Sequence, residues 1–334
     1  MNHRVRQRFL VRGQSAVYHV VNRVALSSMI LDDHAKAVFV RMMRKQARFA
    51  GVEILAFCVM TNHFHILVRV PEPREVGDAE LLKRFRVLYG ESCPASVPQC
   101  DVLEEILKKD DELADAWRTR LHTRMHNLSA FTGELKQRFS IWFNQNRDNK
   151  GTVWSERFRS VIVEDLPEYT APVAAYIDLN PVRAQLVQDP GEYQFSSYGK
   201  VLEGDRGAIQ GLVSIYDSLK SRDSAIAAYR VLLFGKGYLS KGSRCGDDGM
   251  IDPERVSQVI SEGGRLSWSE YLRMKVGYFT KGAALGSRDF VCSLGSLGAM
   301  SPEIENDPRK DAFPLKGLEP AFYSFRNLRK NSFG

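Results

Sequence analysis

Apolar and polar positions in the N-terminal part of the chain predict four strands. Residues 16–24 (AVYHVVNRV) are rich in β-branched and aromatic side chains, which favour strands. Residues 52–60 form a strongly apolar run, and residues 63–70 alternate well enough to form a strand. The turn-compatible pair at 61–62 joins these two strands into a predicted β-hairpin. A short strand is predicted over residues 160–163.

Helical spacing of apolar residues appears between these strands. One helix is predicted to begin at Asp32 or Asp33, either of which can cap it, and to end at Gly51. A second helix is predicted over residues 128–146, where the aromatic side chains have helix-compatible spacing. The charged residues 74–127 between the hairpin and this second helix are expected to form a largely helical insertion.

A third helix is predicted after the fourth strand. It has a plausible start at the capping-box pattern of residues 165–168 or at residues 170–172. It is expected to be interrupted at Asn180, because the residue before a proline avoids the α region. The mixture of strands and helices predicts an α+β fold.

The character of the chain changes after Tyr198. Glycine-rich segments then separate several helical patterns, of which residues 253–260 and 268–274 are the clearest. A chain of 334 residues is also too long for one small domain. We therefore predict a first domain over residues 1–204 and a second, mainly α-helical domain over residues 205–334.

Composition narrows the cellular setting and the class of partner. The chain contains neither the run of roughly 20 apolar residues that a membrane span needs nor an apolar signal peptide, which predicts a cytoplasmic protein. The five cysteines are scattered, which favours reduced thiols over a disulfide framework. The net charge of +7 fits a polyanionic partner. Ten Lys or Arg residues lie within residues 1–50, where a phosphate backbone is most favoured.

The sequence His63-Phe64-His65 is the first candidate for chemistry. In a strand, residues two apart point to the same face, so both imidazoles share one face and Phe64 points to the other. Two such imidazoles can bind one metal ion. The alternative is that both histidines simply lie on a polar face of the sheet.

Tyr176 and Asn180 form the second candidate. Residues four apart on a helix lie on a single face, so a phenol nucleophile and an amide oxygen would reach the same place. The alternative is that Tyr176 packs in the core and Asn180 only ends the helix before Pro181.

Four sequence blocks contain these candidates. They are residues 60–68 (MTNHFHILV), 154–159 (WSERFR), 176–184 (YIDLNPVRA) and 192–198 (EYQFSSY). In this order the blocks resemble the signature blocks of REP-associated tyrosine transposase-like proteins, which are single-tyrosine HUH transposases. Residues 18–23 (YHVVNR) fit the same resemblance, which covers about residues 4–200.

The resemblance implies a ferredoxin-like core, in which an antiparallel sheet carries helices on one face. It implies that His63 and His65 bind a divalent cation, that Tyr176 is the nucleophile, and that Asn180 is a further metal ligand. Imidazole and amide-oxygen ligands suit Mg²⁺ or Mn²⁺ better than zinc. The implied activity is cleavage and rejoining of single-stranded DNA through a 5′-phosphotyrosine, at hairpin or palindromic repeats, and a homodimer is expected from the same resemblance.

Several other residues are weaker candidates. His19 in the first strand either approaches the site or is an ordinary sheet histidine. Trp154 and Phe158 either stack on unpaired bases or pack in the core. Six arginines are candidates for phosphate contacts or for solvated surface, and Arg183 for a structural role. These six are Arg4, Arg6, Arg8, Arg12, Arg157 and Arg159.

Two other functions compete with the transposase hypothesis. One is a domesticated DNA-binding protein that keeps the fold but has little or no chemistry. The other is a metal-dependent hydrolase in which Tyr176 is structural, and it predicts product ends without covalently bound protein. The joint presence of both histidines, Tyr176 and Asn180 favours the transposase hypothesis, and the lack of a second acidic metal cluster disfavours the hydrolase.

Overall fold

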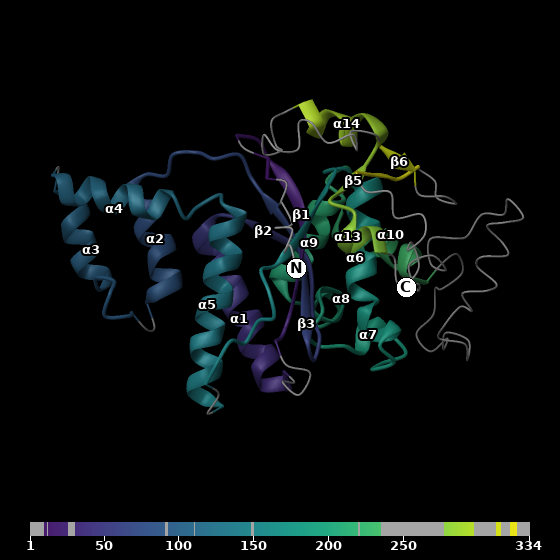
Figure 1. The fold of residues 1–334 in the computed structure, drawn as a ribbon, viewed down its shortest axis with the longest axis horizontal. Coiled ribbons are helices and arrows are strands. Elements are labelled where there is room, and N and C mark those ends of the chain that lie inside the picture. Colours follow the sequence, from purple (N-terminus) through teal and green to yellow (C-terminus); the bar gives the residue numbers. More distant parts are fainter. Residues whose placement is uncertain are drawn as a thin grey trace, which may run out of the picture.

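A central antiparallel sheet organises the molecule, with its first strands in the order β2-β3-β1-β4 (Figure 1). The computed structural model describes residues 10–11, 13–25, 31–90, 93–109, 111–147, 150–219, 221–234, 277–296, 312–314 and 321–325. The four strands are β1 (Ala16–Arg23), β2 (Glu53–Val59), β3 (His63–Val70) and β4 (Arg159–Val163). All four predicted strands, and the β2–β3 hairpin, are confirmed.

Two helices join these strands in the ferredoxin-like βαββαβ order. Helix α1 (Asp33–Ala50) follows β1, and helix α5 (Leu128–Asn146) precedes β4. The Asp32 side chain accepts a hydrogen bond from the backbone N–H of Ala35 and caps α1. Gly51 ends α1 in the left-handed conformation at φ 66°, which glycine adopts without a steric penalty. Both helices confirm the sequence predictions.

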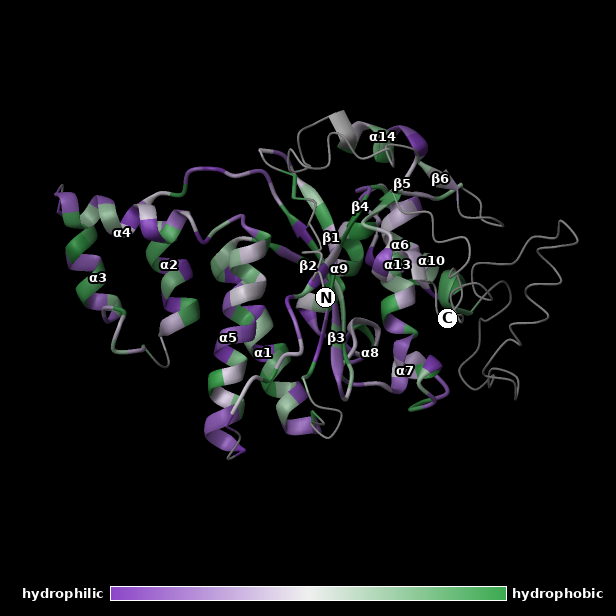
Figure 2. Cartoon of the chain, viewed as in Figure 1, coloured by the Kyte–Doolittle hydropathy of each residue, from purple (hydrophilic) through white to green (hydrophobic). Residues whose placement is uncertain are grey.

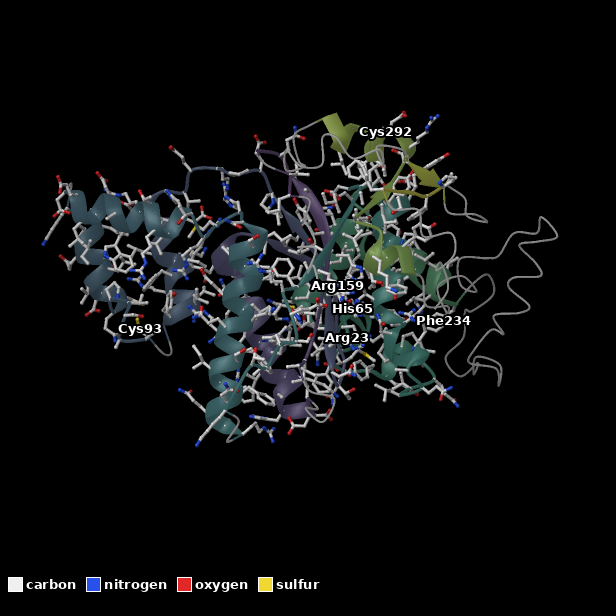
Figure 3. The ribbon with its side chains drawn as sticks, in the orientation of Figure 1. Arg23, His65, Cys93, Arg159, Phe234 and Cys292 are labelled. Carbon is white, nitrogen blue, oxygen red and sulfur yellow. The ribbon has the colours of Figure 1, made fainter. Side chains whose placement is uncertain are left out.

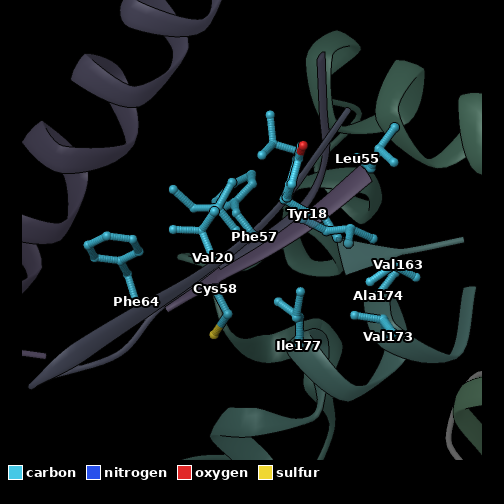
Figure 4. Close-up of a cluster of buried hydrophobic side chains, with 14 of the residues drawn as sticks. Tyr18, Val20, Leu55, Phe57, Cys58, Phe64, Val163, Val173, Ala174 and Ile177 are labelled. Atoms are coloured by element: carbon cyan, nitrogen blue, oxygen red, sulfur yellow. The ribbon is translucent and has the colours of Figure 1, made fainter. Parts of the chain in front are cut away.

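Helices cover both faces of the sheet (Figure 1). Phe64 packs against Phe39 of α1 at a ring-centroid distance of 4.8 Å, so α1 and α5 cover the face to which Phe64 points. His65 points to the opposite face, where α6 (Pro167–Asp178) packs on β2 and β3. Figure 4 shows the buried side chains of this part of the core, including Ile177 of α6. A second helical layer is thus added to the expected one.

Helix α6 begins at Pro167, within the first of the two predicted starts, residues 165–168. Leu166 is its N-cap residue and makes no side-chain cap hydrogen bond, so the predicted capping box is not formed. Pro167 occupies the first turn, where its missing N–H costs nothing. The helix ends at Asp178, and after Leu179 the short helix α7 (Asn180–Arg183) continues the chain.

The insertion contains helices and has an apolar cluster of its own. Its helices are α2 (Asp78–Tyr89), α3 (Cys100–Leu107) and α4 (Glu112–His122). They pack around Phe85 and Leu103, and Phe49 of α1 belongs to the same cluster. Figure 2 shows both hydrophilic and hydrophobic residues along these helices, which lie on the side of α1 and α5 away from α6. The insertion therefore rests on α1 and not on the face that bears the histidines.

The chain after residue 196 packs on the same core. These elements are α8 (Ser197–Leu202), α9 (Arg206–Ile215), α10 (Arg222–Phe234), α13 (Gly277–Lys281), β5 (Ala284–Gly286), α14 (Arg288–Ser296), β6 (Phe313–Pro314) and β7 (Tyr323–Ser324), and the 3-10 turn η1 (Pro190–Glu192) precedes them. Helix α9 packs on β2 and α10 on α6. Strand β5 pairs in parallel with β4, and the described strands form one seven-stranded sheet.

The division of the chain at residue 204 stays a prediction, which unfolding experiments test. The helical patterns predicted over residues 253–260 and 268–274 lie outside the described residues. Among the described residues, no helix is long and apolar enough to cross a membrane.

Candidate active site

The two histidines of the hairpin point to the face of the sheet that α6 covers. Their ring centroids lie 5.0 Å apart. His65 is buried, whereas His63 lies nearer the end of β3 and is partly exposed. Burial, together with the neighbouring histidines, holds the pKa of His65 well below its usual value, so its imidazole is neutral. A neutral imidazole is the form that binds a metal ion.

Tyr176 of α6 lies close to His65 on this face of the sheet. Its ring centroid is 6.2 Å from that of His65 and 6.2 Å from that of His19. The side chain is only 3% exposed. Burial raises the pKa of Tyr176 above 10, and the positive charges of Arg183 and Arg23 oppose that rise. The structure therefore places the phenol beside His65 of the predicted histidine pair.

Arg183 lies against Tyr176. The guanidinium carbon is 4.0 Å from the centre of the phenol ring, and Nη2 donates a 2.6 Å hydrogen bond to the backbone carbonyl of Tyr176. A cation over an aromatic ring is attracted to it and also favours the negatively charged phenolate. Arg183 can thus lower the cost of deprotonating Tyr176, which goes beyond the structural role considered for it.

Asn180 lies one turn after Tyr176. Its Nδ2 donates hydrogen bonds of 3.1 Å to the carbonyls of Tyr176 and Ile177, at the end of α6. The amide nitrogen is therefore used by the helix end, and Oδ1 is the atom that would serve as a metal ligand. The role considered for Asn180 as a helix end and its role as a ligand are compatible.

His19 completes the group of imidazoles. It lies in β1, beside β3, and its Nε2 is 2.8 Å from Nδ1 of His65. Its other nitrogen, Nδ1, is 2.6 Å from the backbone carbonyl oxygen of Phe279 in α13. Burial lowers the pKa of His19 to about 4, and the hydrogen bond to Phe279 opposes that shift only in part.

Two arginines lie at the open end of this face. Arg23 pairs with His63 across β1 and β3, and Arg159 pairs with Val21 across β1 and β4. Val21 also pairs with His65, so both arginines share the face of the histidines. Figure 3 shows Arg23, His65 and Arg159 grouped near the centre of the molecule. Arg159 also forms an ion pair with Glu156.

The other sequence candidates have different positions. Arg157 is exposed in the loop before β4. Trp154 and Phe158 are buried, and Trp154 packs on Phe64 at a centroid distance of 5.3 Å, so both are core residues. Four candidates lie outside the described residues. These are Arg4, Arg6, Arg8 and Arg12.

The donor atoms of the site fit a divalent cation that takes mixed nitrogen and oxygen ligands. Nδ1 of His63 is 2.6 Å from Oδ1 of Asn62, an acceptor, so the Nδ1 of this ring carries the proton and Nε2 has the lone pair. The amide oxygen that Asn180 would offer is a type of ligand that suits Mg²⁺ or Mn²⁺. No group of three or more His, Cys, Asp or Glu side chains in the described part of the chain is arranged to hold a metal. An ion would thus depend on the two histidines and on uncharged oxygen ligands.

Comparison with known protein families finds a match for the segment that contains the histidines. Residues 13–84, which include β1, α1 and the β2–β3 hairpin, match the family model described as "Transposase IS200 like". Over these residues the chain is similar to the IS200-like transposases. The match contains His19, His63 and His65 but not Tyr176. The IS200-like segment therefore supplies the histidine half of the site.

Solved structures give a weaker likeness. The structure of a REP-associated tyrosine transposase bound to a REP hairpin is 16% identical over 61% of this chain and 87% of that one, with a TM-score of 0.38. No curated protein matches the sequence.

Two features of the site were not predicted from the sequence, namely Arg183 as a cation over Tyr176 and Arg23 beside His63. His19 was a weaker candidate, and the structure places it beside His65. The alternation of residues 19, 21 and 23 in β1 gives a signal for His19 and Arg23, because it places both on one face. Arg183 follows a proline and a helix break, so the sequence does not indicate that its side chain points toward Tyr176.

Proposed function

We propose that the chain cuts and rejoins single-stranded DNA through a covalent bond between Tyr176 and a 5′ phosphate. The observation that carries this proposal is the position of the Tyr176 ring 6.2 Å from His65, whose ring lies 5.0 Å from that of His63. The family of residues 13–84 supports a transposase-type activity for the site. Hairpin or palindromic repeats are the proposed substrates.

The reaction has two balanced steps. In the first, the phenol oxygen of Tyr176 forms a bond to the scissile phosphorus, the bond to the 3′ oxygen breaks, and the phenol proton is released as the 3′ oxygen gains one. In the second, the 3′ hydroxyl of another strand attacks the phosphotyrosine and releases the phenol. The energy of the broken phosphodiester is kept in the covalent bond, so joining needs no ATP.

The side chains of this site have different roles in the proposed reaction. Arg183 stabilises the phenolate of Tyr176, and Arg23 and Arg159 attract the phosphates on either side of the cleaved bond. His63, His65 and Asn180 would hold the divalent cation. When bound, this Mg²⁺ or Mn²⁺ would polarise the scissile phosphate and stabilise charge on the leaving oxygen.

A second candidate function is DNA binding with little or no chemistry. The burial of Tyr176 favours it, because a phosphate must reach a phenol that is only 3% exposed. This reading keeps Arg23 and Arg159 as phosphate contacts and assigns Tyr176 to the core.

A denaturing gel separates the two functions. The protein is incubated with Mg²⁺ and hairpin oligonucleotides from the DNA flanking its own gene, labelled at either end. The proposal predicts a covalent adduct on the 5′ side of the cut that disappears in Tyr176→Phe and with EDTA. Tight binding without an adduct would favour the DNA-binding function. Cleavage that persists in Tyr176→Phe would show a metal-dependent nuclease with another nucleophile.

The proposed partner is single-stranded or hairpin DNA, and a homodimer remains a prediction. Both edges of the strands β2-β3-β1-β4 are covered by the chain itself. Helix α9 lies against β2, and β5 pairs with β4. A dimer must therefore use a surface other than these edges.

A further inference from the structure

We propose that His19 is a positioning residue that fixes the tautomer of His65. The backbone carbonyl of Phe279 in α13 in turn fixes the tautomer of His19. The proposal rests on the proposed function in one respect, the identity of His65 as a metal ligand. It assigns a role to a residue that otherwise resembles an ordinary sheet histidine. It also assigns a role to a segment at the far end of the chain.

The starting point is an uninterrupted line of hydrogen-bonding atoms. The carbonyl oxygen of Phe279 is 2.6 Å from Nδ1 of His19, and Nε2 of His19 is 2.8 Å from Nδ1 of His65. The two rings lie nearly parallel, with centroids 5.1 Å apart and planes 24° apart, as expected for two imidazoles joined edge to edge by a hydrogen bond. Both side chains are buried, and His19 is 0% exposed.

The direction of each hydrogen bond follows from the carbonyl. A carbonyl oxygen can only accept, so Nδ1 of His19 must carry a proton. A second proton on Nε2 would place a positive charge on a ring that is 0% exposed, which is strongly disfavoured. Nε2 of His19 therefore has the lone pair and accepts from Nδ1–H of His65.

The consequence appears at the other nitrogen of His65. With its proton on Nδ1, a neutral His65 has its lone pair on Nε2, the atom on the far side of the ring from His19. Metal-binding histidines usually donate their second N–H to an acceptor that fixes the ring and its tautomer. His19 is that acceptor for His65, and Oδ1 of Asn62 has the same relation to His63.

Helix α13 contacts the other half of the site as well. The ring of Phe279 packs edge-on against Tyr176 at a centroid distance of 5.0 Å. One residue of α13 thus holds Tyr176 with its side chain and the His19–His65 pair with its carbonyl. The segment after residue 276 completes a site whose histidines and tyrosine lie a hundred or more positions earlier in the sequence.

Tautomers can be read directly in the metal-free protein. Nitrogen NMR of histidine-labelled full-length protein, without DNA, separates protonated from unprotonated ring nitrogens. We expect His19 and His65 both to carry the proton on Nδ1, with Nε2 of each unprotonated. A proton on Nε2 of His65, or a doubly protonated His19 at pH 7, would overturn the proposal.

Two substitutions extend the test to metal affinity. His19→Gln keeps an acceptor oxygen near the position of Nε2, whereas His19→Phe removes it. In calorimetric titrations with Mn²⁺, we expect His19→Phe to weaken binding by about 10- to 100-fold and His19→Gln to restore most of it. His34→Phe is the matched control, because His34 is exposed on α1. A folded His19→Phe protein with unchanged Mn²⁺ affinity would contradict the proposal.

The outcomes stay informative if a variant fails to fold. Circular dichroism checks folding first, and if His19→Phe does not fold, the wild-type tautomers and the His19→Gln affinity decide the question. Neither measurement involves DNA cleavage. Failure of the Tyr176 adduct assay would therefore count against the proposed function but not against the positioning role of His19. A different tautomer of His65 would count against the positioning role of His19 alone.

Discussion

Asp178 shows how a buried charge joins several elements behind the site. It is the last residue of α6 and is 1% exposed. Its carboxylate accepts hydrogen bonds from Ser197 Oγ, the backbone N–H of Tyr198 and the hydroxyl of Tyr229. Burial nevertheless raises the pKa of Asp178 from 3.8 to about 6, because three donors do not replace the lost solvation.

This shift predicts a dependence of stability on pH. A carboxyl whose pKa is higher in the folded state binds more protons in that state. Its contribution to the free energy of unfolding is therefore complete below pH 3.8 and is lost as the pH rises through about 6. Relative to Asp178→Asn, the wild type should lose about 3 kcal/mol of unfolding free energy between these limits. Urea unfolding across this pH range measures the difference, with the exposed Asp217→Asn as control. Parallel pH curves for wild type and Asp178→Asn would contradict it.

Arg183 gives a second prediction at the scale of one residue. Replacing it with Met removes a positive charge from the face of Tyr176 and should raise the pKa of the phenol further. We expect adduct formation near neutral pH to slow by about tenfold and to recover at higher pH. Arg183→Lys keeps the charge and should fall between wild type and Arg183→Met. A slower rate with an unchanged pH profile would show that Arg183 only supports the end of α6.

The sequence predicted the chemistry of single residues better than their environment. The alternation of His63 and His65 and the spacing of Tyr176 and Asn180 selected these residues, and the structure places the rings of His65 and Tyr176 6.2 Å apart. Burial of Tyr176 and its contact with Arg183 depend on how α6 lies across the sheet. No local pattern encodes that arrangement.

At the scale of elements, a glycine sets the distance between α9 and the edge of the sheet. A Cβ atom on Gly211 would lie 2.3 Å from the carbonyl oxygen of Ile54 and 2.9 Å from that of Leu55, both backbone atoms of β2. Glycine thus permits α9 to cover β2 closely. This contact leaves little room for a further strand along that edge.

Gly211→Ala should therefore push α9 away from β2 and destabilise the fold by about 1 to 3 kcal/mol. Gly207 is the matched control in the same helix, because a Cβ atom there would lie no closer than 3.4 Å to its nearest neighbour, Oδ1 of Asp205. Gly207→Ala should be neutral or slightly stabilising, since alanine favours helices. Equal effects of the two substitutions in urea unfolding would count against the close contact.

Elements with strong periodicity were predicted closely from the sequence. The strands β1 to β4 and the helices α1 and α5 all have clear apolar patterns and defined ends. The short strands β5 and β7 were not predicted, because two or three residues give no period. Their pairing with β4 and with each other depends on the rest of the fold.

At the scale of the whole molecule, the insertion is the part least connected to the site. The backbone N–H of Arg74 is 3.4 Å from Nδ1 of His126, so the two ends of the insertion lie close together. Its apolar cluster meets the core at Phe49, which is 0% exposed. The acidic residues of the insertion therefore lie on a separate lobe, away from the arginines of the site.

Replacing residues 77–125 with a short Gly-Ser linker tests this separation. We expect a folded protein that binds Mn²⁺ like the wild type but melts at a lower temperature, because Phe49 becomes exposed. Calorimetry and thermal unfolding measure the two effects. A folded deletion variant that no longer binds Mn²⁺ would show that the insertion contributes to the site.

The central claim is that Tyr176 forms the covalent bond to DNA. The most direct measurement is mass spectrometry of the adduct after digestion with nuclease and protease. We predict a nucleotide phosphate attached to the phenol oxygen of the peptide that contains Tyr176, and a free 3′ hydroxyl on the released strand. A nucleotide on any other residue, or cleaved DNA with no modified peptide, would contradict the claim.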